Sequence, residues 1–164
     1  MIVFLVGICL MGLFTYHTNS QIQNNQRTLA LMNAKTYGQQ IEDDLENGVG
    51  ITNSLEQILI NSDGQVHDFS KIAKYVMSSS IQSVQLAPNG VVTEIYPENG
   101  NKAGKIDLLN DSNRSEISNY AKKYHTTITQ GPFELKQGGS GIAIRNPVYL
   151  EDENGQEYFW GFTI

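Results

Sequence analysis

The chain opens with an apolar segment. Residues 1–16 include no Asp, Glu, Lys or Arg and only one threonine and one tyrosine with polar groups. As a helix rising ~1.5 Å per residue, this segment spans about 24 Å, a little less than the ~30 Å core of a bilayer. We therefore predict a transmembrane helix over residues 1–17 that is truncated at its start, with a short cleaved signal peptide as the alternative.

A helical pattern follows over residues 18–80. Apolar or small residues recur there at three- and four-residue spacing, which places them on one face of a helix. This stripe consists of Leu31, Ala34, Gly38, Ile41 and Leu45. It packs either on its own domain or on the same helix of a second copy. Gly48 and Gly50 predict a break, before a helix over about 52–60 and another after Asp68. We interpret residues 18–80 as a helical stalk.

The pattern changes to that of strands at Ile81. A weak alternation over residues 81–86, the turn sequence Pro88-Asn89-Gly90 and a β-branched and aromatic run over residues 91–96 predict a β-hairpin over residues 81–96. A helix from about Asn113 and strands from Thr126 onward follow it, with Gly131-Pro132 separating two of these strands. The predicted fold is α+β: long N-terminal helices, then a PAS-like five-stranded antiparallel sheet with an inserted helix over residues 81–164, truncated at its end.

Charge and cysteine content exclude several classes of protein. Among 164 residues, 11 Lys and Arg stand against 17 Asp and Glu, and the net charge is -6. Because nucleic-acid affinity depends on neutralising phosphates, a chain without a basic cluster predicts no nucleic-acid partner. The one cysteine, Cys9, can form neither an intrachain disulfide nor a cysteine-ligated zinc site.

Motifs for catalysis are missing from the sequence. The histidines His17, His67 and His125 have no carboxylates at metal-binding spacing. No Gly-x-Ser-x-Gly sequence and no phosphate loop occurs, and the glycines of 138–141 lie between strands rather than before a helix. We expect no catalytic residue, no metal and no cofactor, and we do not expect this segment to be an enzyme.

One charged residue interrupts an apolar strand. Arg145 lies within residues 142–148, and a charge in such a strand needs a partner or must reach solvent. It is either an outward-facing or ion-paired arginine, or an anchor for an anionic or carbonyl-bearing ligand. We predict a small-molecule site between the sheet and the loops of residues 96–109, although core packing is the alternative for its apolar members. The predicted ligand-binding residues are Tyr96, Phe133, Leu135, Arg145 and Tyr149.

A series of short motifs extends over the second half of the chain. They lie at residues 86–92, 95–97, 100–101, 104–109, Arg114, 131–135, 137–139, 145–149 and 159–162. In their order and spacing these motifs resemble the CHASE domain, the extracytoplasmic sensor domain of membrane receptors such as histidine kinases and diguanylate cyclases. No single motif is specific, and the resemblance rests on the series.

The resemblance implies a domain that senses a small molecule outside the cytoplasm and passes the signal to an output module, such as a diguanylate cyclase or a histidine kinase, beyond this sequence. We accordingly expect a location at the cell membrane, with residues 18–164 extracytoplasmic, and a homodimer formed through the N-terminal helix. The ligand stays unknown. Two alternatives are a pilin-like structural protein, which the lack of Glu in the apolar segment disfavours, and a membrane-anchored solute-binding accessory protein.

Overall fold

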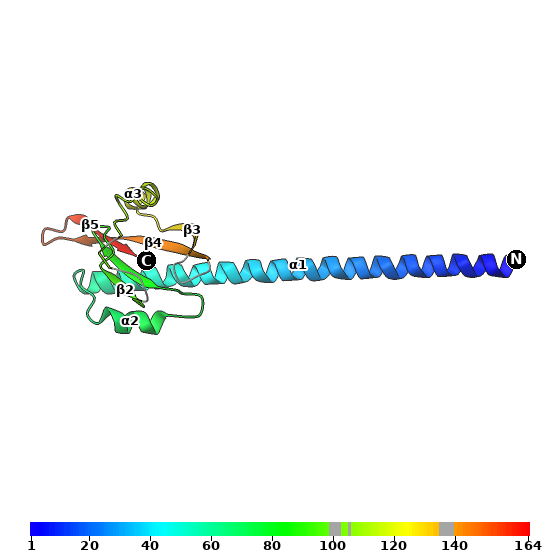
Figure 1. Ribbon diagram of the computed structural model, residues 1–164. Coiled ribbons are helices and arrows are strands. Elements are labelled where there is room, and N and C mark those ends of the chain that lie inside the picture. The colour runs from blue at the N-terminus through cyan, green and yellow to red at the C-terminus, as the bar shows by residue number, and fades with distance from the viewer. Residues whose placement is uncertain (99–102, 105, 135–139) are drawn as a thin grey trace. The chain divides into compact units, whose positions relative to one another are not determined.

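The computed structural model describes residues 1–98, 103–104, 106–134 and 140–164 (Figure 1). It divides the chain into two compact units, residues 1–43 and 44–164. One helix, α1 (Ile2–Asn61), contributes to both units. Because the remaining helices and all strands belong to residues 44–164, the second unit holds the sheet and its core.

The first unit is helical, and its large apolar side chains are exposed. Phe4 and Phe14 are 75% and 73% exposed. Within the part of the chain that the structure describes, no helix combines the length and apolarity needed to cross a membrane, and the predicted transmembrane helix finds no support there. In the stripe, Leu31 and Ile41 are exposed, so the alternative in which these two residues pack in the core of their own domain is wrong.

Helix α1 continues through Gly48 and Gly50, where the sequence predicted a break. A glycine inside a helix costs about 1 kcal/mol relative to alanine, which tertiary packing readily offsets. Gly48 is buried, and the space that a Cβ would occupy there is taken by the side chain of Ile144. Beyond it, Leu55 and Leu59 are fully buried. The helix therefore persists because its glycine allows close approach to the sheet.

The second unit contains a five-stranded antiparallel sheet in the order β2-β1-β5-β4-β3. The strands are β1 (Val84–Pro88), β2 (Glu94–Tyr96), β3 (Ile128–Glu134), β4 (Ser140–Glu151) and β5 (Glu157–Thr163). The shorter helices are α2 (Phe69–Val76) and α3 (Ser115–Tyr124), which is inserted between β2 and β3. The predicted α+β class, with a long N-terminal helix, five antiparallel strands and an inserted helix, is confirmed.

Two apolar clusters cover the two faces of this sheet. On one face, Leu55 and Leu59 of α1 and Phe69 of α2 pack with Leu86 and Val148. On the other face, Ala121 of α3 packs in a cluster with Ala87, Ile95, Leu108 and Phe162. Neighbouring residues on a strand point to opposite faces, which is why Leu86 and Ala87 belong to different clusters. Figure 1 shows α2 and α3 on opposite sides of the sheet.

The turns of the sheet follow the sequence in one place and depart from it in another. Asn89 and Gly90 have φ values of 53° and 84°, as the predicted hairpin turn requires. In contrast, Gly131-Pro132 does not separate two strands. It lies inside β3, where the register with β4 shifts between Gln130 and Phe133. A bulge lets the strand continue past a residue that cannot donate to the ladder.

Gly161 of β5 allows the backbones of two strands to pass close together. A Cβ at this position would lie 2.7 Å from Pro88 Cα and closer still to the Ala87 carbonyl oxygen, and these backbone atoms cannot move aside. We expect Gly161→Ala to lower the free energy of unfolding by about 1–3 kcal/mol, the usual effect of overpacking. Urea denaturation measures this change.

The matched control is Gly50→Ala in α1, where, apart from the adjacent residues and the backbone of the helix itself, no described atom lies within 4 Å of the added Cβ. Alanine is the better helix former, so this variant should be more stable by up to about 1 kcal/mol. Equal effects of the two substitutions would contradict the tight crossing at Gly161.

Candidate functional site

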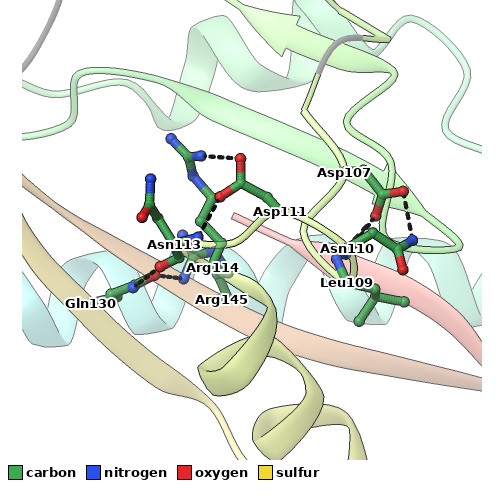
Figure 2. Close-up of polar contacts among 8 residues, drawn as sticks. All are labelled: Asp107, Leu109, Asn110, Asp111, Asn113, Arg114, Gln130 and Arg145. Atoms are coloured by element: carbon green, nitrogen blue, oxygen red, sulfur yellow. Dashed lines mark hydrogen bonds and ion pairs between the residues drawn. The ribbon is translucent and has the colours of Figure 1, made fainter.

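Arg145 lies in β4 and is only 2% exposed. It stands opposite Ile128 of β3 in the register of the sheet. Its neighbour Asn146 donates a hydrogen bond to Glu56 of α1, on the α1 face. Because side chains alternate along a strand, Arg145 belongs to the opposite face. Figure 2 shows its side chain beside Gln130 and the residues that begin α3.

Gln130 holds the Arg145 guanidinium in place. Arg145 Nη1 donates a hydrogen bond to Gln130 Oε1 at 2.6 Å. The other end of the same amide, Gln130 Nε2, donates to the Asn113 carbonyl oxygen at 2.8 Å. Gln130 thus connects the buried arginine on β4 to the segment that leads into α3 (Figure 2).

The guanidinium of Arg145 has no carboxylate partner among the described residues. The nearby carboxylate of Asp111 is used by Arg114, whose Nη1 lies 2.8 Å from Asp111 Oδ2. Asp111 Oδ1 accepts a hydrogen bond from the Asn113 backbone N–H at 2.9 Å. Arg145 Nε is buried and has no hydrogen-bond partner in the described chain. Arg145 is therefore neither an outward-facing arginine nor, within those residues, an ion-paired one.

The surroundings of Arg145 disfavour its charge. Burial lowers the pKa of Arg145 to about 10, and the positive charge of Arg114 acts in the same direction. Asp111 opposes both effects, although less strongly. Removing a cation from water without an opposite charge is costly, and the lowered pKa reflects that cost. At neutral pH the group is still protonated, so the cluster holds a buried cation that has no anion of its own among the residues that the structure describes.

A turn stabilised by Asp107 precedes this cluster. Asp107 Oδ1 accepts hydrogen bonds from the backbone N–H groups of Leu109 and Asn110 at 3.0 and 3.1 Å, and Oδ2 accepts one from Asn110 Nδ2 at 2.8 Å (Figure 2). The side-chain hydrogen bond from Asn110 is the largest cause of the lowered pKa of Asp107. The turn fixes the path of the chain just before Asp111 and Arg114.

The other predicted ligand-binding residues do not gather around Arg145. Tyr96 is half-buried and packs against the cluster on the α1 and α2 face, opposite to Arg145. Tyr149 donates a hydrogen bond to the Lys122 carbonyl oxygen, and its ring stacks on His125 at the C-terminal end of α3. Phe133 is half-buried in β3 beyond the bulge. Leu135 lies outside the described residues.

The residues that do contact or act on Arg145 were missed as site residues. Gln130 is separated from Arg145 by fifteen positions, and only the pairing of β3 with β4 brings them together. Asp111 and Arg114 carry a weak signal, since opposite charges three residues apart at a helix start commonly pair. Within the described residues, no three metal-ligating side chains gather in one place.

Comparisons with known proteins add a likeness of fold. No family model and no curated protein matches the chain, so the CHASE resemblance is not confirmed. A solved structure described as an extracellular ligand binding receptor from Desulfohalobium retbaense DSM5692 matches with a TM-score of 0.57 and 14% identity. The match covers 76% of this chain and 22% of that one, so this chain spans about a fifth of the receptor's length.

A buried cation without a carboxylate partner in the described chain predicts an unusual effect on stability. We expect Arg145→Met to leave the free energy of unfolding at pH 7 unchanged or to raise it by about 1–3 kcal/mol, because methionine removes a desolvated charge. Between pH 10 and the ordinary pKa of arginine, the unfolded chain keeps a proton that folded Arg145 has released. Raising the pH through this range should therefore stabilise the wild type relative to the variant.

Chemical denaturation at pH 7 and above pH 10 measures both effects. Arg114→Met serves as the control, since the Arg114–Asp111 pair is about one-third exposed and should contribute less than about 1 kcal/mol. A clear loss of stability in Arg145→Met alone would mean that Arg145 stabilises the fold, and it would then not be a ligand anchor.

Proposed function

We propose that the chain is the extracytoplasmic ligand-sensing domain of a membrane-bound receptor. The observation that carries this proposal is the buried guanidinium of Arg145, which lacks a carboxylate partner in the described chain. A buried cation in that state is typical of a binding site, because a ligand can supply the missing interaction. In this proposal the ligand binds between β4 and the segment that leads into α3, which Gln130 connects.

The likeness of fold supports the same class of function. The similar structure from Desulfohalobium retbaense is described as an extracellular ligand binding receptor. Since one fold hosts many functions, this likeness raises the plausibility of a ligand-binding role without identifying a ligand. The CHASE-like series of motifs agrees with it and extends the proposal to an output module such as a diguanylate cyclase or a histidine kinase.

The N-terminal residues support attachment to a membrane. The large apolar side chains of residues 2–16 that the structure describes are exposed, and the sequence has no Asp, Glu, Lys or Arg before Arg27. An apolar surface of this kind is favourable in contact with lipid and costly in water. In this proposal residues 18–164 lie outside the cytoplasm.

A thermal-shift screen of small metabolites tests the ligand-binding role. A ligand present at 100 times its dissociation constant stabilises the folded state by about 2.7 kcal/mol, which raises the melting temperature of a domain of this size by several degrees. We expect hits with the wild type that disappear with Arg145→Ala, since losing a charge-assisted hydrogen bond weakens binding by about 1.5–3 kcal/mol. The control is Lys123→Ala on exposed α3, which should keep every hit. The proposal would be contradicted if no metabolite raised the melting temperature, or if every hit raised it equally in the wild type and in Arg145→Ala.

Association through α1 is the second testable part of the proposal. Leu31 and Ile41 expose apolar surface on the stripe, and an apolar stripe at this spacing is suited to pairing with the same helix of another copy. We expect light scattering to show a dimer at high concentration and Ile41→Glu to weaken it, because the new carboxylate would face a like charge in the partner.

Gln40→Glu is the matched control for this dimer. It introduces the same charge on the same exposed helix but outside the stripe, so it should leave the dimer intact. If Ile41→Glu and Gln40→Glu dimerise as strongly as the wild type, the stripe is not the interface.

A further inference from the structure

One edge of the Arg145 guanidinium, formed by Nε and Nη2, is left without a hydrogen-bond partner among the described residues. Its Nη1 is engaged by Gln130, whereas its Nε is buried and has no hydrogen-bond partner in the described chain. No hydrogen bond of Nη2 to a described residue occurs either. The Nε–H and one Nη2–H of a guanidinium point to the same side, at a spacing that matches the two oxygens of a carboxylate. This unpartnered edge is therefore the one whose geometry suits a planar oxyanion with two parallel hydrogen bonds, and an oxyanion that reaches it must displace the atoms that cover Nε.

The charges around this edge favour an anion with a single charge. Arg145 and Arg114 contribute two positive charges, and Asp111 contributes one negative charge, so the group carries a net charge of about +1. A monoanion brings the total to zero. A phosphate dianion would leave an excess negative charge at a site where Arg145 is 2% exposed, and a buried excess charge is strongly disfavoured.

We infer that the ligand of this domain carries a carboxylate, which binds side-on to the Nε–Nη2 edge of Arg145. This inference rests on the proposed function and adds the chemical class of the ligand. Arg145 provides the charge and the two donors. Arg114 and Asp111, each about one-third exposed, compensate one another and set the net charge of the site.

Gln130 acts as a positioning residue in this site. Its amide oxygen accepts from Arg145 Nη1 and its amide nitrogen donates to the Asn113 carbonyl, so both ends of the amide are fixed. Rotation of the guanidinium would break the bond to Gln130. The Nε–Nη2 edge is consequently held in one orientation before a ligand arrives, which lowers the entropy lost on binding.

Formate, the smallest carboxylate, is a direct probe of this edge. The full chain, labelled with ¹⁵N-arginine, is titrated with formate while the Nε–H resonance of Arg145 is followed. The resonance is assigned by its loss in Arg145→Lys. We expect a saturable shift with formate, no shift with formamide, which has a similar shape and no charge, and a weaker response to inorganic phosphate. The inference is overturned if formate leaves the chemical shift of the Arg145 Nε–H resonance unchanged, or if formamide shifts it equally.

Two variants separate the charge of Arg145 from its geometry. Arg145→Lys keeps the positive charge but lacks the planar pair of donors, so a carboxylate found in the metabolite screen should bind at least about tenfold more weakly. Gln130→Ala should weaken the same carboxylate several-fold and broaden the Arg145 Nε resonance, a readout that a purely structural role would not change. Wild-type affinity in Arg145→Lys would overturn side-on binding.

The outcomes distinguish this inference from the proposed function. Metabolite hits that depend on Arg145 but contain no carboxylate would leave the ligand-binding function in place and overturn the carboxylate. A saturable formate response at Arg145 with no metabolite hit would support the carboxylate edge and contradict the ligand-sensing function.

Discussion

Alternation of side chains along β4 is the constraint on which the rest of the second unit depends. Successive residues of a strand face opposite sides of the sheet, so Arg145 and Asn146 enter two different environments. Arg145 meets Gln130 beside the segment that leads into α3, whereas Asn146 meets Glu56 of α1 and Thr127, with 2.8 Å between the atoms in each of its hydrogen bonds. A displacement of β4 at Arg145 would therefore also move Asn146 relative to its partner Glu56 on α1.

The contact between α1 and the sheet is suited to carry such a displacement. Apolar packing by Leu55 and Leu59 supplies the buried area, and polar bonds give it a fixed register. Thr163 of β5 donates a hydrogen bond to the Thr52 carbonyl at 3.0 Å, so the helix is attached to two neighbouring strands. Two apolar surfaces can shift against each other at low cost in free energy. Hydrogen bonds between defined partners oppose such a shift, because it would break them. These hydrogen bonds consequently fix the position of residues 52–56 of α1 against β4 and β5.

How far the sequence predicted the molecule depended on the range of the interaction. The turn at Asn89-Gly90 was predictable because neighbouring residues determine it. The helix after Asp68 was predicted too, although Asp68 makes no side-chain hydrogen bond to the helix and does not cap it as the sequence indicated. The continuity of α1 through Gly48 was not, since it depends on Ile144 nearly a hundred positions away. Arg145 was singled out correctly as unusual, because a charge in an apolar strand is a local signal. Its partner Gln130 depends on strand register, which no local pattern contains.

The cost of Arg145 argues for a role in binding more than in folding. Holding the pKa of an arginine at about 10 corresponds to a free energy of about 3 kcal/mol against the charged form at neutral pH. That is a large share of the 5–15 kcal/mol, roughly, by which domains are stable. A carboxylate bound at the Nε–Nη2 edge would replace the lost hydration of the guanidinium with two charge-assisted hydrogen bonds. In the proposed complex, relief of that cost would contribute to the free energy of binding at Arg145.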